Sequence, residues 1–479
     1  MPALSPLDLA MFLLESPERP FNIGPLVLLR PPADFKGSFA DKLLARMLQR
    51  PAGAPFDYRL QMSLLRAPSV ESIGAADLRP HVHRLTLRRA STAQLLKKVC
   101  ELHESVLERS GMLWQFWVID GLADGRVALY AKVHHGIIDG RGFVGAMMQW
   151  LSEDPQDKQV RALWEALPRS AAGGARGGGL LQSLLRGPAQ AAGWLKSAAG
   201  VYGLLAEQGL RASGLGKGTA LPFLQVPKAF HGKLSAQRSC AYCSLPLDEL
   251  KALGKAQRAT VNDLLLTLVD MAMQRHLAQD GKTPAQPLVA DMPIALSAGA
   301  KGGNQIAVLQ FPLGRADATP AQRLAAVRAE TARLKQSLSR RSSDTVMLYT
   351  TLVHALPLLA EKAGVKRAPR LANLLVSNPF GLDSPRWLMG AAVELMLPIS
   401  LVSAGHQLNI TAVTLGPRLQ IGFLAMPDAV PQIERLAQYT EQAFPELARS
   451  LEPAPVPPAP KRAASKRRRR PSPVQPSHA

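Results

Sequence analysis

Two adjacent histidines open a seven-residue run, His134-His135-Gly136-Ile137-Ile138-Asp139-Gly140. A neutral imidazole can take a proton from a hydroxyl group near neutral pH, because the ordinary pKa of histidine lies close to that range. We therefore predict that His135 acts as a general base, with His134 orienting the loop. Asp139 is expected to support the motif structurally, and Gly140 to permit a tight turn that other residues cannot follow.

Two other interpretations of the histidine pair stay open from the residues alone. The pair could simply pack or form hydrogen bonds, as most histidines do. It could also bind a metal ion, but adjacent residues on a strand point to opposite faces, and no HExxH motif or Cys/His cluster lies nearby. We expect no metal site. The sequence also lacks a GxSxG elbow and a Walker-type phosphate loop, which argues against a serine hydrolase and a P-loop enzyme.

The elements around the run are expected to expose it. Residues 114–120 and 126–133 have the composition of strands, and Asp124-Gly125 between them predicts a hairpin. The second strand would deliver both histidines at its end, where rigid scaffolds commonly present reactive groups. A helix is expected to follow over residues 141–150.

Three more helices have clear start signals. A capping-box pattern at residues 91–94 precedes apolar residues at helical spacing, and we expect this helix to end at Gly111. A second cap at residues 260–263 predicts a helix that stops near Gly281. The pair at residues 319–320, Thr followed by Pro, opens the third helix.

Length and composition indicate a globular protein. The 479 residues suffice for two or three units with their own cores, and 47% of them are apolar and 19% charged. We see no secretory signal. No apolar run approaches the length of about 20 residues that a membrane-spanning helix needs. Cys240 and Cys243 form a CxxC pair, which we interpret as chance thiols rather than redox chemistry. A cytoplasmic, reducing compartment is therefore expected.

Changes in composition divide the chain into four predicted segments. Residues 1–165 form a first globular half that contains the histidine run. Residues 166–227 form a linker and crossover segment, within which the Gly-rich residues 171–179 have the composition of a flexible linker. Residues 228–451 form a second globular half. Residues 452–479 form a tail rich in Pro, Arg and Lys that is expected to be disordered.

The charge of the chain indicates a preference for anionic surfaces. The formal net charge is +21, and the tail has no acidic residue from position 453 onward. Such a balance favours membrane lipid, nucleic acid or the phosphates of CoA, and charge alone does not choose among them. Residues 180–210 have a weak amphipathic pattern that fits either a crossover helix or a helix lying on a membrane surface.

Further blocks carry a resemblance to a known family. The run that begins at His134 is the HHxxxDG motif of the CoA-dependent acyltransferase superfamily. From about Ala3 to Leu451 the chain resembles the bacterial wax ester synthase/acyl-CoA:diacylglycerol acyltransferases. The blocks that carry this closer resemblance follow in the family's order: Leu4-Ser5-Pro6-Leu7-Asp8 with Phe12-Leu13, Phe21-Asn22-Ile23-Gly24, Leu113-Trp114, Thr260-Val261-Asn262-Asp263, Leu375-Val376-Ser377-Asn378-Pro379-Phe380-Gly381 and Leu408-Asn409-Ile410-Thr411.

The chain departs from the family pattern at three places. Met112 stands where the family usually has Pro, and Pro379-Phe380 replaces the commoner Val-Pro. After Asn409 the usual Ser-Tyr pair is missing. These departures leave His135 untouched and bear on the preference for the acyl acceptor.

The resemblance implies an α/β (α+β) fold of two chloramphenicol-acetyltransferase-like halves. Each half would be a mixed sheet with helices, with an active-site channel between the halves and His135 midway along it. Acyl-CoA would serve as co-substrate, with no bound cofactor, and a diacylglycerol or a long-chain alcohol would attack the thioester directly. Asn262 would donate a hydrogen bond to the oxyanion, or would instead cap the start of its helix.

The resemblance also implies a location and leaves two alternatives. It implies a bacterial protein in peripheral contact with the inner face of the plasma membrane or with lipid inclusions, and no nucleic-acid partner. One alternative is a transferase of the same superfamily that acts on a small hydroxyl or amine, which the blocks outside the motif disfavour. The other is a non-catalytic lipid-surface-binding protein, which the intact His135 and Asp139 disfavour.

Overall fold

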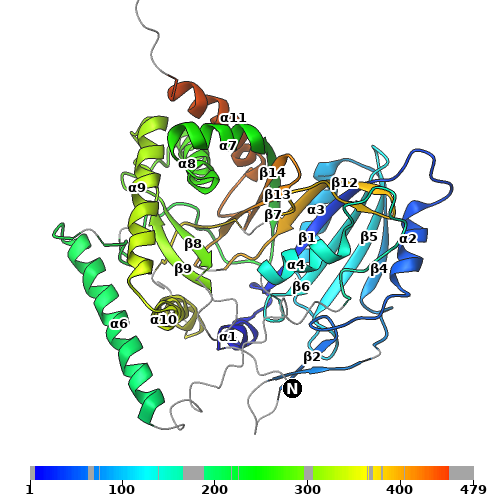
Figure 1. The fold of residues 1–479 in the computed structure, drawn as a ribbon, viewed down its shortest axis with the longest axis horizontal. Coiled ribbons are helices and arrows are strands. Elements are labelled where there is room, and N and C mark those ends of the chain that lie inside the picture. The colour runs from blue at the N-terminus through cyan, green and yellow to red at the C-terminus, as the bar shows by residue number, and fades with distance from the viewer. Residues whose placement is uncertain are drawn as a thin grey trace, which may run out of the picture.

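Two six-stranded sheets stand side by side in the computed structural model, and helices cover both (Figure 1). The structure describes residues 6–62, 69–74, 76–138, 140–165, 188–216, 218–224, 226–295, 306–363, 365, 370–378, 381–403 and 405–452. Asp139, the Gly-rich residues 171–179 and the tail from residue 453 lie outside these residues. The two mixed sheets with their helices confirm the predicted fold class.

The first sheet has the strand order β11-β12-β1-β6-β5-β4. Its neighbours pair antiparallel except for β4 and β5, which are parallel. The hairpin of β5 and β6 confirms the prediction for residues 114–133. The strands of this sheet are β1 (Asn22–Arg30), β4 (Val82–Ala90), β5 (Trp114–Leu122), β6 (Val127–His134), β11 (Trp387–Leu388) and β12 (Ala391–Ile399).

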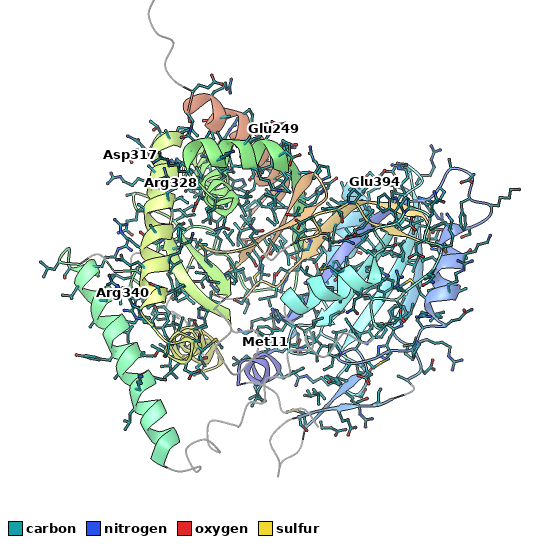
Figure 2. The ribbon with its side chains drawn as sticks, viewed as in Figure 1. Met11, Glu249, Asp317, Arg328, Arg340 and Glu394 are labelled. Carbon is teal, nitrogen blue, oxygen red and sulfur yellow. The ribbon has the colours of Figure 1, made fainter. Side chains whose placement is uncertain are left out.

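The first sheet takes two of its strands from the second half of the chain. β12 pairs with β1 from Gly24 to Arg30, and Glu394 of β12, labelled in Figure 2, forms an ion pair with Arg30 at 2.5 Å. Arg126 approaches the same carboxylate at 3.7 Å. The sequence did not predict the pairing of β1 with β12, because the two strands are more than 350 residues apart in the chain.

The helices of the first half are α1 (Pro6–Leu14), α2 (Phe39–Met47), α3 (Thr92–His103) and α4 (Gly140–Trp150), and a small hairpin joins β2 (Tyr58–Gln61) to β3 (Ser69–Ser72). α4 matches the helix that we predicted after the histidine run. The capping box at the start of α3 is also present.

The end that we predicted for α3 is wrong. The helix stops at His103 and not at Gly111. Two buried side chains from other strands take the carbonyl groups at this point: Lys132 donates to the carbonyl oxygens of Leu102 and Ser105 at 2.9 and 3.1 Å, and Asn22 donates to that of His103 at 3.1 Å. These partners replace the hydrogen bonds that a further helical turn would make.

The second sheet has the order β7-β14-β13-β10-β8-β9, with parallel pairing only between β13 and β10 and between β10 and β8. Its strands are β7 (Ser239–Pro246), β8 (Val289–Ala295), β9 (Ile306–Pro312), β10 (Leu374–Ser377), β13 (Leu408–Leu415) and β14 (Arg418–Ala425). Its helices are α6 (Pro188–Ala212), α7 (Leu247–Gln257), α8 (Val261–Gln279), α9 (Pro320–Ser339), α10 (Ser343–Lys362) and α11 (Ile433–Ser450).

Local start signals predicted two of these helices correctly. Both α8 and α9 begin at a complete capping box, with Thr260 and Asp263 in the first and Thr319 and Gln322 in the second. α6 starts at Pro188, a residue that fits the first turn of a helix because its missing amide hydrogen has no acceptor there. Within the described residues, no helix has both the length and the apolar character to cross a membrane.

One apolar core extends across both halves. It contains Leu26 and Tyr130 from the first sheet and Cys240, Cys243 and Phe423 from the second. Cys240 and Cys243 are buried free thiols on β7, as expected for chance cysteines with a packing role. The two sheets meet at β12, which contacts β13 and β14 of the second sheet (Figure 1).

Candidate active site

The turn after β6 separates the two histidines by their exposure. His134 ends the strand, and only 1% of its surface is exposed, whereas the side chain of His135 is partly exposed. The backbone N–H of His134 donates to Leu113 at 2.9 Å, and that of His135 donates to Phe21 at 2.8 Å. The backbone of both residues is fixed, and of the two imidazoles that of His135 is the more exposed.

Three groups hold the ring of His134 in one orientation. The N–H of Gly136 donates to Nδ1 at 3.0 Å, and the ring of Phe12 stacks on the imidazole at 4.0 Å between centroids, with an interplanar angle of 3°. Nε2 lies 3.5 Å from Oε1 of Glu15. Because Nδ1 accepts a hydrogen bond, the ring proton lies on Nε2, which faces the carboxylate.

Glu15 is the residue that links this turn to the end of α1. Burial opposes its ionisation, but the hydrogen bond with His134, together with those from Phe21 and Arg109, holds the pKa of Glu15 below its ordinary value. Glu15 also accepts from the backbone N–H of Phe21 at 3.1 Å and from Arg109 at 3.2 Å, and Arg109 donates to the carbonyl oxygen of Phe12 at 2.7 Å. The carboxylate is thus charged and anchored at neutral pH.

Two glycines near the turn are required by close backbone or ring contacts. A Cβ on Gly136 would lie 2.6 Å from the Phe12 ring and 3.0 Å from Nδ1 of His134. A Cβ on Gly24 would lie 1.7 Å from the carbonyl oxygen of Ala131 on β6. Gly24 therefore lets β1 approach β6, and this is the physical reason for a glycine at the end of the Phe-Asn-Ile-Gly block.

A buried polar layer lies beneath the turn. Burial lowers the pKa of His103 to about 3 and that of Lys132 to about 8, so at neutral pH the imidazole is neutral and the amine is charged. The Nε2 of His103 donates to the carbonyl oxygen of Ser400 at 2.9 Å, and Nδ1 accepts from the hydroxyl of Tyr130 at 2.6 Å. This layer connects the first half to the segment that follows β12.

The remaining predicted site residues are less well tied to this turn. Asp139 lies outside the described residues, so its supporting role stays a prediction, and Gly140 is the first residue of α4. Asn262 is the second residue of α8, and its side chain is partly exposed. The cap of that helix is made by Thr260 and Asp263, so Asn262 is not the capping residue. Its role as an oxyanion donor stays a prediction.

Two blocks of the second half have structural partners. A Cβ on Gly381 would lie 2.2 Å from the backbone nitrogen of Thr414, so this glycine lets its segment approach β13. The amide of Asn409 donates to Ser400 Oγ at 3.1 Å and to the carbonyl oxygen of Leu401 at 2.8 Å. These contacts fix the segment between β12 and β13, at the junction of the two sheets.

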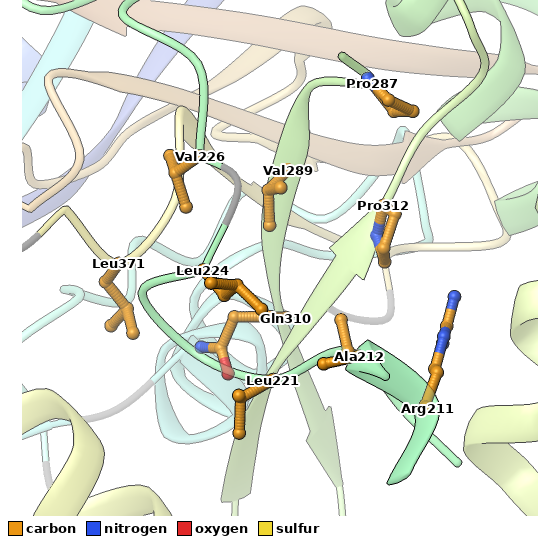
Figure 3. A pocket seen from close by; sticks show the side chains of 11 residues that line it. Arg211, Ala212, Leu221, Leu224, Val226, Pro287, Val289, Gln310, Pro312 and Leu371 are labelled. Atoms are coloured by element: carbon orange, nitrogen blue, oxygen red, sulfur yellow. The ribbon is translucent and has the colours of Figure 1, made fainter. Parts of the chain in front are cut away.

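A cavity of about 240 Å³ lies in the second half and not at the histidine turn. Figure 3 shows its lining side chains, which come from the end of α6, the segment after it, and strands β8 and β9. Gln310 and Val289 are on its walls. None of the residues that line it belongs to the HHxxxDG motif.

Sequence reasoning missed several residues of the site. Phe12 belongs to a block that resembles the family, but its stacking on a ring more than 100 residues away could not be read from it. Glu15 and Lys132 carry no local signal, because their partners belong to other elements. The spacing within the motif located the turn, and the residues that hold it had to come from the structure.

Comparisons with known proteins agree with the resemblance. The model of the wax ester synthase/diacylglycerol acyltransferase catalytic domain matches residues 4–265, and the model of the C-terminal domain of the same family matches residues 302–448. Among curated proteins, "Probable diacyglycerol O-acyltransferase Tgs4" of Mycobacterium tuberculosis is 31% identical over 470 residues, covering 93% of this chain and 96% of the relative. A second protein of that organism, named "Probable diacyglycerol O-acyltransferase tgs2", is 29% identical over 462 residues, covering 94% and 100%.

Solved structures show the same fold. The wax ester synthase/diacylglycerol acyltransferase from Marinobacter aquaeolei superposes with a TM-score of 0.70 at 23% identity, over 94% of this chain and 99% of that chain. The first condensation domain of the CDA synthetase superposes with a TM-score of 0.54 at 15% identity, over 92% and 95% of the two chains.

Proposed function

Because this chain belongs to the wax ester synthase/diacylglycerol acyltransferase family, a family of acyltransferases, we propose that His135 is the general base that drives acyl transfer from a long-chain acyl-CoA. The acceptor would be the hydroxyl group of a diacylglycerol or of a long-chain alcohol. The products would be a triacylglycerol or a wax ester, together with free CoA.

One observation carries the proposal: the turn holds one histidine and leaves the other accessible. His134 is fixed by Gly136, Phe12 and Glu15, whereas the His135 side chain emerges partly exposed from the same fixed backbone. A base must lie within hydrogen-bond reach of the proton that it takes, and a rigid backbone keeps it there. Mere packing of two histidines would not require one ring to carry three fixing contacts.

The reaction balances without a covalent intermediate. Nε2 or Nδ1 of neutral His135 takes the hydroxyl proton while the oxygen attacks the thioester carbonyl carbon. The tetrahedral intermediate then collapses, the C–S bond breaks, and the thiolate of CoA receives a proton from the imidazolium. A preorganised donor to the oxyanion contributes about 3 kcal/mol, and Asn262 is our candidate for this donor.

The test is an acceptor panel with palmitoyl-CoA as donor. Dioleoylglycerol, hexadecanol and a small hydroxyl acceptor are each supplied to the purified protein, and the lipid products are separated and quantified. We expect a triacylglycerol or wax ester product from the wild type and almost none from His135→Ala. The matched control is His83→Ala, a partly exposed histidine of the first half whose ring lies tilted against that of Trp117, and this variant should keep its activity.

Two outcomes would contradict this proposal. One is product only with the small acceptor, which would favour the small-acceptor transferase. The other is a stable palmitoyl adduct on the protein, seen by intact-mass measurement after incubation with palmitoyl-CoA alone, which would mean that a covalent acyl-enzyme exists.

We also propose peripheral contact with a lipid surface through α10, α6 and the basic tail. Leu352, Leu356 and Leu359 are 50%, 53% and 57% exposed and recur at helical spacing along one side of α10. α6 packs against α10 and exposes Leu195 by 73% and Tyr202 by 76% (Figure 1). An apolar stripe of this kind suits the apolar region of a lipid surface, and the basic residues in the sequence of the tail suit anionic headgroups.

Vesicle co-sedimentation tests this contact. Vesicles of phosphatidylcholine with phosphatidylglycerol are incubated at low salt with the wild type, with a chain lacking residues 453–479, and with the triple variant Leu352→Ser, Leu356→Ser, Leu359→Ser. Both changes should weaken binding. The control replaces three exposed apolar residues of the first half by Ser, namely Leu48, Met62 and Val106. Equal binding by all four proteins would reject the contact.

A further inference from the structure

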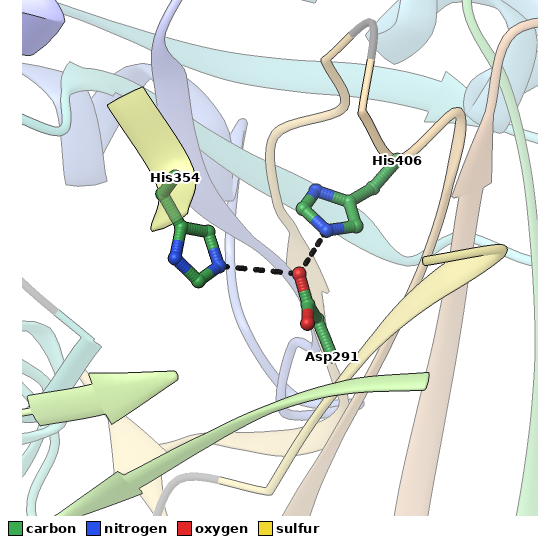
Figure 4. A group of neighbouring side chains, drawn as sticks. All are labelled: Asp291, His354 and His406. Carbon is green, nitrogen blue, oxygen red and sulfur yellow. Dashed lines mark hydrogen bonds and ion pairs between the residues drawn. The ribbon is translucent and has the colours of Figure 1, made fainter. Parts of the chain in front are cut away.

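Two histidines and one aspartate from distant segments of the second half meet, with both imidazoles at one oxygen of the aspartate (Figure 4). Asp291 comes from β8, His354 from α10 and His406 from the segment that leads from β12 to β13. Oδ2 of Asp291 lies 3.2 Å from Nε2 of His354 and forms a hydrogen bond with Nε2 of His406. The three potential ligand atoms all lie within 4.8 Å of one another.

The position of one proton makes this arrangement unusual. Nδ1 of His354 lies 2.9 Å from the carbonyl oxygen of Thr350, which can only accept, so Nδ1 carries the proton. A neutral His354 would therefore turn the lone pair of Nε2 toward the Asp291 carboxylate. Two electron-rich atoms at 3.2 Å need a positive centre between them, which is either a second proton on the imidazole or a bound cation.

The outer contacts are those of a prepared metal site. Gln310 donates to the second oxygen of Asp291 at 2.7 Å, and Thr350 holds the far nitrogen of His354. Ser403 Oγ lies 3.5 Å from Nδ1 of His406, and the backbones of these two residues exchange hydrogen bonds at 2.8 and 3.1 Å. Metal-binding histidines typically anchor their other ring nitrogen in this way, which fixes the ring before the ion arrives.

We propose that Asp291, His354 and His406 bind a divalent transition-metal cation, with Zn²⁺ as the best match. Two imidazoles and one carboxylate are a ligand set that Zn²⁺ accepts, with a fourth position left for water. Mg²⁺ and Ca²⁺ prefer oxygen ligands, so they suit this set poorly. The cation takes the place of the positive centre that the two histidines and the buried carboxylate require.

The site adjoins the cavity and has a structural consequence. Gln310 lines the cavity shown in Figure 3 and donates to Asp291, so this side chain contacts both. A bound ion would join β8 and α10 to the segment that carries the chain from β12, in the first sheet, to β13, in the second. The ion would therefore fasten the junction between the halves rather than take part in acyl transfer.

Zinc binding to the full-length protein tests the proposal. The chain is purified with a tag that contains no histidine, stripped with a chelator, and titrated with ZnCl₂ by calorimetry, with the bound metal counted by mass spectrometry. We expect about one Zn²⁺ per chain and a rise in melting temperature on binding. His406→Ala and His354→Gln should each weaken the affinity by at least about tenfold.

The matched control is His276→Gln, a buried histidine of the second half that contacts Phe230 and lies outside the cluster. It should bind Zn²⁺ like the wild type. His354 is partly exposed, so the His354→Gln variant keeps the test valid if His406→Ala does not fold. Failure of the wild type to bind zinc, or unchanged affinity in a folded His354→Gln protein, would overturn the proposal. Either result would leave the acyl-transfer proposal untouched.

Discussion

The histidine turn of the first half and the Asp291 cluster of the second half use the same chemical groups in opposite ways. In the turn, His134 and His135 are neighbours in sequence, and Glu15 faces only the buried one. In the cluster, one fully buried carboxylate meets two imidazoles that lie 63 and 115 residues further along the chain. The first arrangement places one imidazole at a partly exposed position, whereas the second gathers its ligand atoms around one buried carboxylate.

This difference shows why one region is suited to catalysis and the other to structure. Backbone hydrogen bonds to Leu113 and Phe21 hold the main chain of the turn, and Gly136, Phe12 and Glu15 orient the His134 ring within it. In the cluster, side chains from three separate elements meet at the carboxylate of Asp291. A turn whose main chain is held by backbone hydrogen bonds and a cluster held by a single carboxylate should respond differently to substitution.

The largest effect is expected from Gly24→Ala. The new Cβ would lie 1.7 Å from a backbone oxygen of β6, and a backbone clash between paired strands cannot be relieved by a side-chain rotation. We expect little folded protein and no acyl transfer, measured by soluble yield and circular dichroism. Gly203→Ala in α6 is the control, since nothing lies within 4 Å of its added Cβ. A folded, active Gly24→Ala protein would show that β1 can shift and that the backbone frame is not rigid.

A smaller loss, of folding stability, is expected from Asp291→Asn. Removal of the charge leaves two imidazoles and Gln310 around a neutral amide in a site with no exposed surface. Breaking a buried charged pair costs about 3 kcal/mol, so the urea midpoint should fall markedly. Chemical unfolding of both proteins, stripped of metal, measures this. An unchanged midpoint would mean that the cluster does not hold the three elements together.

A moderate effect on catalysis is expected from Gly136→Ala. The added Cβ meets the far edge of the Phe12 ring at 2.6 Å, so the ring and His134 must shift while the backbone stays folded. A small displacement of the base lowers kcat by about tenfold or more, with little change in melting temperature. The double variant Gly136→Ala, Phe12→Leu should recover part of the activity. No recovery would show that the glycine acts through something other than this ring.

The smallest effect is expected from Glu15→Gln. The lowered pKa of Glu15 means that its charge stabilises the folded state fully above the ordinary carboxyl pKa, and that this contribution is lost as the pH falls through the lower folded value. We expect a difference of about 1 kcal/mol at pH 7, because the Gln oxygen can still accept hydrogen bonds from Phe21 and Arg109, and a smaller one near pH 3.5. Melting curves across this range measure it. A difference that grows on acidification would contradict the assignment of Glu15 as a charged partner.

The elements that sequence reasoning predicted are those with local signals. The hairpin before the motif and the starts of α8 and α9 rest on residues within four positions of one another, and all three are confirmed. The end of α3 was wrong because Lys132 and Asn22, from two strands, take its last carbonyl groups. The insertion of β12 and the Asp291 cluster depend on contacts across hundreds of residues or across three elements, and no local pattern records them.

The residues of the site divide in the same way, into those with a local sequence signal and those without one. The motif located His134 and His135, but Phe12, Glu15 and Lys132, which hold the turn, come from α1, its end and β6. Gly24 was noted as part of a block, and only the strand register gives its physical reason. Asn262 belongs to a block that sequence reasoning also noted, and its action on the oxyanion awaits an activity measurement.

The most direct test of the account is the rate of CoA release by His135→Ala with palmitoyl-CoA and an acceptor, in protein shown to be folded by circular dichroism. A general base contributes about 100-fold or more, so we predict a fall of at least that size. Added imidazole should restore part of the rate, because the vacated position is accessible. A folded His135→Ala protein whose rate stays within about tenfold of the wild type would contradict the central claim.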